Sequence, residues 1–357
     1  MIKSIRELKN VKGKTVLLRA DFNVPIQNGK VVDAFRIIKA LPTIKYLQSK
    51  KAKIIIVSHA GKDGSQSLAP VHKVLAKQVK NIFVPEVFGS KTEKAVGDMK
   101  PGDVVLLENL RMERGEKEND VVFAKKLAKL ADIYVNEAFP VSHRAQASIV
   151  LVPKYLPSYA GLQLVEEIKQ LSKCLHPKHP FLFILGGAKF DTKMPLLNKY
   201  LKIADHVFIG GALANNFFKA EGFDVKKSLV DDGNFGIEKL LKNKKLIIPC
   251  DFVMDNEMIV DVGPDAVKAL LPIIQKAKTI VWNGPLGFYE KGFTKATKTL
   301  LSALARAKAE TIIGGGDTAA LISPKMEKQF TFVSTGGGAT LDFLTKGTLP
   351  GIKALDK

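Results

Sequence analysis

The chain has 357 residues, of which 46% are apolar and 25% are charged, and its formal net charge is +20. This composition is globular and the length suggests two domains, so disordered, fibrous and membrane-spanning proteins are excluded. The excess of positive charge favours an anionic partner, which could be nucleic acid, a membrane surface or a phosphorylated metabolite.

In the first half of the chain, short apolar runs alternate with helical patterns. The predicted strands are residues 15–19, 53–57, 82–84, 104–107 and 133–135. Helices are expected between them, including residues 71–79 and one that Asn119 or Asp120 caps. This alternation predicts a doubly wound α/β domain, with a parallel sheet and helices on both faces.

Pro42 indicates where the first long helix starts. Because proline favours the first turn of a helix, we expect this helix to begin near Pro42 and to end near Lys50. Arg36 then lies in the connection before the helix, where side chains more often serve function than packing.

Polar side chains follow several of these strands, at the point where each strand ends. They are Asp21, Asn23, His59, Arg111 and Arg144, and Arg36 can reach the same place. The carboxyl ends of parallel strands meet at one edge of a sheet, which is where ligands bind in open α/β folds. Arginine suits phosphate and carboxylate oxygens, so we expect a small acid that carries phosphate. The alternative is a set of unrelated surface residues.

A proline-rich segment divides the chain into two halves. Pro153 and Pro157 mark this boundary, and Ser158 can cap the helix that follows. Leu164 and Ile168 lie on one face of that helix. We expect it to connect two domains.

The second half repeats the alternation and adds glycines at the strand ends. The predicted strands are residues 181–185, 206–209, 246–248, 279–281, 311–313 and 332–333. Glycine pairs follow the first two strands and glycine triplets follow the last two. Glycine lets backbone N–H groups approach a phosphate closely, and a helix N-terminus adds positive potential. A helix is expected to start near Phe190, with Lys189 just before its first residue and Lys193 one turn into it. Both lysines can therefore reach one phosphate chain.

The segment from Thr311 to Ala320 combines a strand, three glycines and a helix start. Asp317 is a good N-cap residue for that helix, and a tight turn with an Asp cap is the alternative interpretation. An acid beside a phosphate is favourable if Mg²⁺ lies between them. The second triplet, Gly336–Gly338, also precedes a helix and strengthens the prediction of a nucleotide-phosphate site.

Two other classes of protein remain open. A nucleic-acid binder would explain the charge, but the lysines are spread along the chain instead of being gathered in a patch. A nicotinamide-dependent oxidoreductase would share the architecture, but no G-x-G-x-x-G follows a strand.

The cysteines and the N-terminal segment bear on the compartment. Cys174 and Cys250 lie far apart in the chain, which favours reduced thiols over a disulfide. The first residues lack the apolar core of a signal peptide. We therefore expect a cytoplasmic location.

Ten blocks of sequence carry a family resemblance. They are RADFNVP (19–25), DAFRI (33–37), SHAGK (58–62), ENLRM (108–112), SHRAQAS (142–148), GGAKFDTK (186–193), WNGPLGFYE (282–290), IIGGGDTA (312–319), STGGGAT (334–340) and LPGI (349–352). In these blocks, which run the length of the chain in the family's order, the sequence resembles the phosphoglycerate kinases.

The resemblance implies a kinase of glycolysis that reversibly transfers a phosphoryl group from 1,3-bisphosphoglycerate to ADP, giving 3-phosphoglycerate and ATP, with Mg²⁺. It implies two doubly wound, Rossmann-like α/β domains, joined by a helix and a hinge that closes over the substrates. The first domain would comprise residues 1–155 together with the tail 345–357. The connecting helix would be residues 156–173, and the nucleotide domain would be residues 174–344. We also expect a monomer with no nucleic-acid or membrane partner.

The resemblance also implies roles for individual residues. The triose acid is expected at Asp21, Asn23, Arg36, His59, Arg111 and Arg144. The nucleotide is expected at Gly187, Lys189, Lys193, Gly210, Gly211, Asn283, Pro285, Glu290, Gly314, Gly315, Gly316, Asp317 and Thr318. Glu290 would contact the ribose, and Asp317 would act through Mg²⁺. Arg36, Lys189 and the N–H groups of Gly337 and Gly338 would be catalytic, since phosphoryl transfer depends on positioning and charge neutralisation.

The chain departs from the family pattern at several positions, including Ala60 and Asp63, where leucine and proline are usual. Lys62 stands where the family usually has arginine, so its contact with substrate stays open. Gln146 replaces a common histidine and Met112 replaces a usual phenylalanine.

Overall fold

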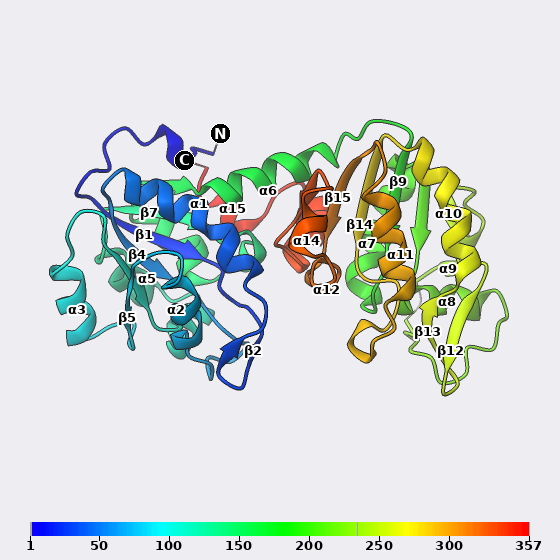
Figure 1. Ribbon diagram of the computed structural model, residues 1–357, viewed down its shortest axis with the longest axis horizontal. Coiled ribbons are helices and arrows are strands. Elements are labelled where there is room, and N and C mark those ends of the chain that lie inside the picture. The colour runs from blue at the N-terminus through cyan, green and yellow to red at the C-terminus, as the bar shows by residue number, and fades with distance from the viewer. Residues whose placement is uncertain (1, 234, 357) are drawn as a thin grey trace. The chain divides into compact units, whose positions relative to one another are not determined.

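The computed structural model describes residues 2–233 and 235–356. The chain divides into two compact units: unit 1 is Met1–Lys169 with Thr348–Lys357, and unit 2 is Gln170–Gly347. Each unit is a sheet covered by helices (Figure 1). Among the described residues, no helix has both the length and the apolar character that crossing a membrane requires.

Unit 1 contains a six-stranded sheet in the order β5-β6-β4-β1-β7-β8. The strands are β1 (Thr15–Ala20), β4 (Lys53–Val57), β5 (Ile82–Val84), β6 (Val104–Leu107), β7 (Ile133–Glu137) and β8 (Ser158–Ala160). All neighbours pair in parallel. The five strands predicted for this half are confirmed, and β8 is an additional edge strand.

The remaining elements of unit 1 are helices and one small hairpin. They are α1 (Phe35–Ser49), α2 (Ala69–Leu75), α3 (Ser90–Gly97), α4 (Arg114–Lys117), α5 (Val121–Ala128), α6 (Leu162–Lys173), α15 (Pro350–Lys353), η1 (Ile5–Glu7), η2 (Leu110–Met112), η3 (Phe139–Val141), η4 (Ala147–Leu151), η5 (Val152–Lys154), β2 (Ile26–Gln27) and β3 (Lys30–Val31). The N-cap predicted for α5 is confirmed, because the Asp120 side chain accepts a hydrogen bond from the Phe123 N–H.

Helix α1 begins earlier than predicted. It spans Phe35–Ser49 with Pro42 in its interior, so the prediction of a start near Pro42 is wrong. Its buried face, which includes Ile44 and Leu47, packs on the core of unit 1. Burying this face contributes more than the single backbone hydrogen bond that proline removes. Arg36 therefore lies in the first turn of α1.

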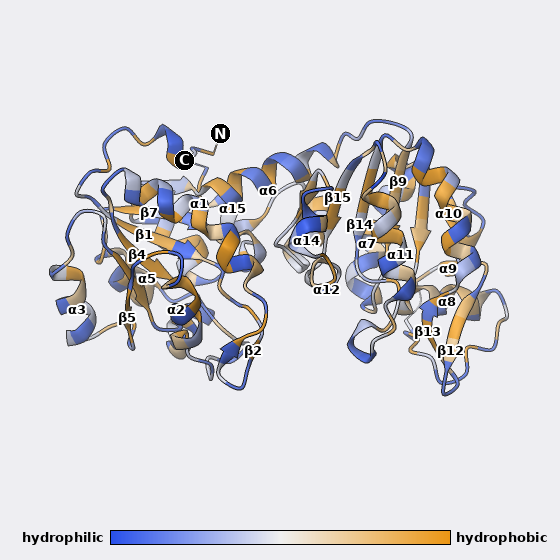
Figure 2. Ribbon diagram, in the orientation of Figure 1, coloured by the Kyte–Doolittle hydropathy of each residue, from blue (hydrophilic) through white to orange (hydrophobic). Residues whose placement is uncertain are grey.

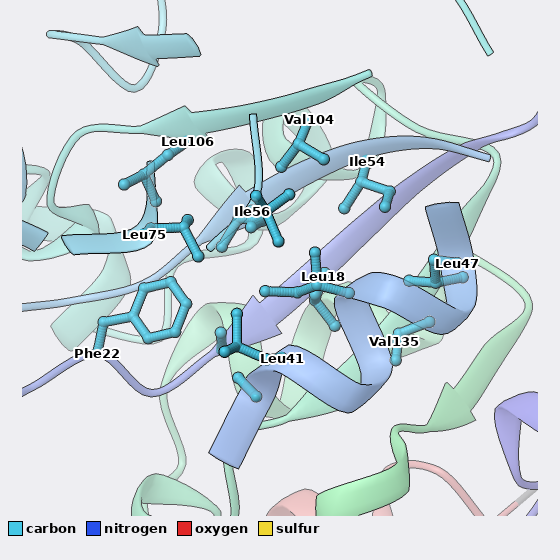
Figure 3. Packing of buried hydrophobic residues seen from close by; sticks show 14 of the residues in the cluster. Leu18, Phe22, Leu41, Leu47, Ile54, Ile56, Leu75, Val104, Leu106 and Val135 are labelled. Carbon is cyan, nitrogen blue, oxygen red and sulfur yellow. The ribbon is translucent and has the colours of Figure 1, made fainter. Parts of the chain in front are cut away.

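The core of unit 1 lies between α1 and the sheet. Figure 3 shows Leu41 and Leu47 of α1 directed toward Leu18 of β1, with Ile56 of β4 beside them. Leu18, Leu47 and Ile56 are fully buried. This continuous apolar packing holds the strand ends, and the polar residues that follow them, in fixed positions.

The start of α6 is also stabilised differently from the prediction. Ser158 belongs to β8, so the prediction that it caps the helix is wrong. The buried carboxylate of Glu137, at the end of β7, accepts from the N–H groups of Gln163 at 3.1 Å and Leu164 at 3.2 Å. A carboxylate at this position satisfies N–H groups that have no partner within the helix. The division between the two units falls within α6.

Unit 2 contains a second six-stranded sheet, in the order β11-β10-β9-β14-β15-β16. Its strands are β9 (Phe181–Leu185), β10 (His206–Ile209), β11 (Leu246–Ile247), β14 (Thr279–Asn283), β15 (Glu310–Gly314) and β16 (Phe332–Val333), and an antiparallel pair is formed by β12 (Phe252–Asp255) and β13 (Met258–Val262). The helices are α7 (Phe190–Ile203), α8 (Ala212–Ala220), α9 (Ile237–Leu241), α10 (Pro264–Lys276), α11 (Lys295–Leu304), η6 (Tyr289–Lys291), α12 (Gly316–Ala319), α13 (Pro324–Glu327) and α14 (Gly338–Lys346). The six predicted strands and the start of α7 are confirmed.

The central strands of unit 2 are buried along their whole length. Every residue of β9 and β14 is buried, and Figure 2 shows β9 in the colour of hydrophobic residues. This pattern is typical of a parallel sheet with helices on both faces. The expected fold class, two parallel α/β sheets flanked by helices, is therefore confirmed.

Each sheet has a point where the strand order reverses. In unit 1, β4 and β7 lie on opposite sides of β1; in unit 2, β10 and β14 lie on opposite sides of β9. The loops that leave neighbouring strands at such a point diverge and open a crevice at the carboxyl edge. Ligand sites are therefore expected outside β1 and outside β9.

Candidate functional site

The candidate site of unit 1 starts at the carboxyl end of β1. Asp21 is buried, and its Oδ1 accepts a hydrogen bond from the Asn23 N–H at 2.9 Å. Arg36, in the first turn of α1, donates from Nη1 to the Asn23 carbonyl at 2.9 Å and lies 3.5 Å from Asp21 Oδ2. Burial raises the pKa of Asp21, but Arg36, His59 and the Asn23 N–H outweigh it, so the pKa lies below its usual value. Asp21 is therefore an anion that orients Arg36.

Hydrogen bonds connect the loop after β4 to the residues that follow β1 and β6. Asn23 Oδ1 accepts from the Gly61 N–H at 3.0 Å, and Arg111 Nη1 donates to the Gly61 carbonyl. Asn109 adds two hydrogen bonds through Nδ2, to the carbonyls of Ala60 at 2.8 Å and Gln66 at 2.7 Å. The ends of β1, β4 and β6 thus form one hydrogen-bonded edge.

Arg111 is a buried cation with unused donors. Its Nε and Nη2 have no hydrogen-bond partner within the part of the chain that the structure describes. Burial, followed by the charges of Arg144 and Arg19, lowers the pKa of Arg111 to about 10. A buried donor left unpaired costs about 1–3 kcal/mol. An anionic ligand would satisfy these donors and relieve the repulsion between the guanidinium groups.

His59 lies beside Arg111 at the same edge. Burial is the main reason that the pKa of His59 lies well below its usual value, and Arg19, Arg111 and Arg36 lower it further against the opposing effect of Asp21. His59 is therefore neutral at pH 7. Its Nε2 is buried and has no hydrogen-bond partner among residues 2–233 and 235–356.

The structure brings most of the residues predicted for the triose acid together. Asp21, Asn23, Arg36, His59 and Arg111 are joined by the hydrogen bonds and charge interactions described above. Arg144 is exposed, and its Nε lies 3.4 Å from Nε2 of the neighbouring His143. Its charge lowers the Arg111 pKa, so it belongs to the same basic region.

Unit 2 has a cavity of about 200 Å³ at the carboxyl ends of β9, β10 and β14. One wall includes five of the residues predicted for the nucleotide site, namely Gly187, Gly211, Pro285, Glu290 and Asp317. The other wall is apolar and includes Phe218, Leu229, Phe252, Ile259 and Leu286. A cavity with one apolar wall and one wall of glycine loops can bind a flat ring on the first and phosphates on the second.

Three glycine loops pack directly against one another beside this cavity. The Gly187 N–H donates to the Pro285 carbonyl at 2.8 Å, and the Gly211 N–H donates to the Leu286 carbonyl at 3.0 Å. A Cβ added at Gly284 would overlap the carbonyl oxygen of Gly186. The loops after β9, β10 and β14 can approach so closely only because these positions lack side chains.

The two predicted lysines differ in exposure. Lys189 is the exposed N-cap residue of α7, whereas Lys193 is buried and its Nζ donates to the Gly186 carbonyl. Burial lowers the pKa of Lys193 to about 8, with Asp317 raising it and Lys189 lowering it. The charges of Lys189 and Asp317 therefore both act on Lys193, whose ammonium group lies next to Gly186.

Asp317 is held differently from the prediction. Helix α12 begins at Gly316 with Gly315 as its N-cap residue, so the prediction that Asp317 caps it is wrong. Gly315 has a positive φ of 98°, and the helix starts two residues earlier than predicted. Asp317 is exposed in the first turn, and its Oδ1 accepts from the Tyr289 hydroxyl at 2.9 Å. The carboxylate is therefore available to a cation.

Two buried polar atoms surround the glycine triplet after β15. Asn283 Nδ2 and Thr318 Oγ1 have no hydrogen-bond partner within the described ranges. The nearby Gly314 would place a Cβ 3.0 Å from Asn283 Nδ2. Such unpaired atoms beside a glycine run fit a ligand that supplies both donors and acceptors.

The second glycine triplet is held by the first triplet and by a side chain of α14. The Gly315 N–H donates to the Gly336 carbonyl at 3.2 Å, and the Thr340 hydroxyl donates to the same carbonyl at 2.9 Å. Gly337 is the N-cap residue of α14, and Gly338 is its first residue. The N–H groups in a first helical turn have no partner within the helix, so this end can donate to an anion.

Sequence reasoning missed the apolar wall of the unit 2 cavity. Much of it comes from β12 and β13, which were not predicted. Their turn holds Asn256 and Glu257 at positive φ values of 47° and 62°. An Asn in a short polar turn between two apolar runs is a hairpin signal that could have identified these strands.

Comparisons with known proteins agree with the motifs. The family model described as phosphoglycerate kinase matches residues 5–347. A phosphoglycerate kinase of Wolbachia sp. subsp. Drosophila simulans is 41% identical over 391 aligned positions, covering 98% of this chain and 97% of the relative. One from Fervidobacterium nodosum is 40% identical over 393 positions, covering 99% and 98%.

Two solved structures extend this similarity to the fold. The phosphoglycerate kinase from Coxiella burnetii has a TM-score of 0.82 at 36% identity, covering 100% of this chain and 99% of that one. The enzyme from Pyrococcus horikoshii OT3 has a TM-score of 0.90 at 30% identity, covering 99% and 98%. The two-sheet α/β architecture described above matches both.

Proposed function

The chain belongs to the phosphoglycerate kinase family, and from this premise we propose that its two strand-end sites divide the substrates of a Mg²⁺-dependent reaction between them. As a member of this family it is a kinase, and its reaction is phosphoryl transfer between 1,3-bisphosphoglycerate and ADP. The proposal concerns which residues bind each substrate and how the transfer is assisted.

Unit 1 binds 3-phosphoglycerate or 1,3-bisphosphoglycerate. The observation that carries this assignment is the pair of unpaired donors on buried Arg111, next to His59 and Arg36. Three guanidinium groups in one basic region repel one another until a multiply charged anion lies among them. Asp21 and Asn23 orient Arg36 and the loop at Gly61, and Arg144 adds charge at the exposed rim.

Unit 2 binds the nucleotide in its 200 Å³ cavity. The base lies on the apolar wall and Glu290 contacts the ribose. The phosphates extend along the glycine loops, where Lys193 and Lys189 supply positive charge. The residues of this group are Gly187, Lys189, Lys193, Gly210, Gly211, Asn283, Pro285, Glu290, Gly314, Gly315, Gly316, Asp317 and Thr318.

Asp317 is the residue that would hold Mg²⁺. No cluster of three His, Cys, Asp or Glu side chains suited to a metal occurs in residues 2–233 and 235–356. One exposed carboxylate beside phosphate-binding loops nevertheless fits Mg²⁺, which commonly uses one or two carboxylates with substrate phosphates and water. When bound, the ion would neutralise charge on the phosphate oxygens.

The chain's own residues promote transfer by positioning and by charge. A carboxylate and an ADP phosphate are already adequate nucleophiles, so no strong base is required. Arg36 and Lys189 flank the transferring phosphoryl group, and the N–H groups of Gly337 and Gly338 donate to its oxygens. We infer that a hinge closure unites the two half-sites and excludes water.

The remaining assignments follow from the same premise. We propose a first domain of residues 1–155 with 345–357, a connecting helix 156–173 and a nucleotide domain 174–344, for an enzyme that acts as a monomer. A cytoplasmic location is supported by the two cysteines, which are both free thiols.

A coupled assay of ATP formation from 1,3-bisphosphoglycerate and ADP tests the function. We expect activity with Mg²⁺, its loss with EDTA and its recovery with added Mg²⁺; ATP formation that is indifferent to EDTA would refute the metal assignment. Small-angle scattering should give a smaller radius of gyration with 3-phosphoglycerate and an ATP analogue together than with either alone. Binding to DNA that weakens steeply with salt, without kinase activity, would favour the nucleic-acid alternative.

A further inference from the structure

Arg19 is a fully buried arginine that the proposed substrate contacts leave unused. It lies in β1, where it is in register with Val57 of β4 and Asn136 of β7. Its Nε donates to the Ser148 hydroxyl at 2.8 Å, and its Nη1 donates to the Ala20 carbonyl. A guanidinium held in this way within a strand has one orientation.

Glu116 of α4 also holds Arg19 in place. Its Oε1 lies 3.8 Å from Arg19 Nη2 and accepts from the Ser148 hydroxyl at 2.6 Å, while its Oε2 accepts from the Ser148 N–H at 2.8 Å. Tyr134 completes the group, since its hydroxyl donates to the Ser148 carbonyl at 2.7 Å. None of these bonds involves His59, so the guanidinium is placed independently of the imidazole.

The guanidinium also contacts His59. Arg19 Nη2 lies 3.3 Å from His59 Nδ1. A guanidinium has donors only, so Nδ1 must be the acceptor of this hydrogen bond. The ring proton then lies on Nε2. An imidazolium would set an Nδ1–H against the Nη2–H, which both charge and geometry oppose.

Asp21 is a nearby acceptor that could favour the other tautomer. Its Oδ1 is 4.0 Å from His59 Nδ1, which is beyond hydrogen-bond distance, and it already accepts from the Asn23 N–H at 2.9 Å. Arg19 therefore has the shorter and better-directed contact with Nδ1.

We propose that Arg19 is a positioning residue that holds His59 as the neutral Nε2–H tautomer, so that the ring offers one directed N–H donor to the phosphorylated acid. The inference rests on the proposed function of unit 1. Nε2 is buried and has no hydrogen-bond partner within the described ranges, so its donor is available to a ligand. The low pKa of His59, caused first by burial, agrees with a neutral ring.

In this arrangement the positive charge of the site and its directed hydrogen-bond donor come from different side chains. Arg36, Arg111 and Arg144 supply positive charge, and a further cation among them would be repelled. A neutral N–H adds a hydrogen bond to the anion without adding charge. Since hydrogen bonds to charged groups contribute about 1.5–3 kcal/mol, loss of the donor would weaken binding roughly 10-fold or more.

The tautomer can be measured directly in the wild-type protein. Multiple-bond ¹H–¹⁵N correlation spectra distinguish the protonated ring nitrogen from the unprotonated one, and the signals that vanish in His59→Gln identify His59 among the six histidines. We expect protonated Nε2 and unprotonated Nδ1 at pH 7. A ring protonated at Nδ1, or at both nitrogens, would overturn the proposal.

Two variants test whether Arg19 is what sets the tautomer of His59. Glu116→Gln changes a buried neighbour of Arg19 that does not contact His59, and Arg19→Met/Glu116→Gln also removes the donor without leaving an unpaired buried carboxylate. We expect Glu116→Gln to keep the Nε2–H tautomer and the KM for 3-phosphoglycerate. The double variant should lose the single tautomer and raise this KM about 10-fold, with a much smaller change in kcat.

The outcomes distinguish this inference from the proposed function. A double variant that keeps both the tautomer and the KM would overturn the role of Arg19. If it does not fold, the wild-type spectrum still decides which nitrogen carries the proton. The spectrum requires no substrate, so a wild-type protein that shows the Nε2–H tautomer but does not bind 3-phosphoglycerate would contradict the proposed function alone.

Discussion

The hydroxyl of Tyr289 donates a hydrogen bond of 2.9 Å to Oδ1 of Asp317. Burial first, and then the hydrogen bond to the carboxylate, raise the pKa of Tyr289 above its usual value. The phenol therefore stays protonated and remains a donor at any physiological pH. It holds one oxygen of the residue to which we assign Mg²⁺, as partners of metal ligands commonly do.

Tyr289→Phe should weaken the binding of Mg-ADP. The loss of one partly exposed hydrogen bond, about 1 kcal/mol, predicts a rise of about 5-fold in KM for Mg-ADP with a smaller effect on kcat. Steady-state kinetics at varied Mg²⁺ concentration measure it. Tyr155→Phe, at an exposed tyrosine of unit 1, is the matched control and should change nothing. An unchanged KM in Tyr289→Phe would mean that the hydroxyl does not orient Asp317.

Arg36→Ala and Lys189→Ala should each reduce kcat by about 10²–10³, as expected for removal of a donor that stabilises transferring charge. Arg36 is already oriented by Asp21 and the Asn23 carbonyl, so little reorganisation is needed during the reaction. Lys189 is exposed, so its removal should leave the unfolding transition unchanged. Single-turnover phosphoryl transfer provides the measurement.

Lys45→Ala is the control for charge alone. Lys45 is an exposed residue of the helix that carries Arg36, so its substitution removes one positive charge without changing a residue of the site. Near-normal kcat in Arg36→Ala or Lys189→Ala would refute the role given to that residue. A comparable loss in Lys45→Ala would instead indicate a general effect of net charge.

Gly284→Ala and Gly292→Ala separate backbone strain from crowding. Their φ values are nearly equal, at 90° and 87°, but an added Cβ would overlap the Gly186 carbonyl at Gly284 and meets no atom within 4 Å at Gly292. Strain alone should cost about 1–2 kcal/mol in both. Crowding should add about 1–3 kcal/mol at Gly284. Equal shifts of the urea midpoint in the two variants would show that the glycine loops can separate freely.

Glu137→Gln should change how stability depends on pH. Burial raises the pKa of Glu137 to about 7, against the hydrogen bonds from Thr43, Gln163 and Leu164 that lower it, and Glu167 raises it further. The folded state thus binds the proton more tightly than the unfolded state, whose value is near 4.5. The free energy of unfolding therefore falls as the pH rises from about 4.5 to about 7 and then levels off.

The variant lacks this titration. Between pH 5 and pH 8, the wild type should lose stability relative to Glu137→Gln by an amount of order 1–3 kcal/mol. Urea unfolding at both pH values measures the difference. A wild-type-to-variant difference that is the same at pH 5 and pH 8 would show that the Glu137 pKa is not raised.

Much of the fold could be predicted because buried parallel strands are continuous apolar runs in the chain. Lys53–Val57 and Phe181–Leu185, for example, were predicted at their observed bounds. Helix boundaries that depend on contacts between residues far apart in the chain could not be predicted in this way. Helix α1 continues through Pro42 because its buried face packs on the sheet, and α6 is capped by Glu137, which lies 26 residues before Gln163.

The linear order of residues determined the alternation of strands and helices, the glycine loops at the strand ends and the motifs that identify the family. These depend on neighbours along the chain, so local patterns reveal them. Only the tertiary structure decided that Arg19 meets His59 across 40 residues and that Lys193 is buried while Lys189 is exposed. Such contacts depend on which strands pair and which side chains lose water, and both are properties of the folded packing as a whole.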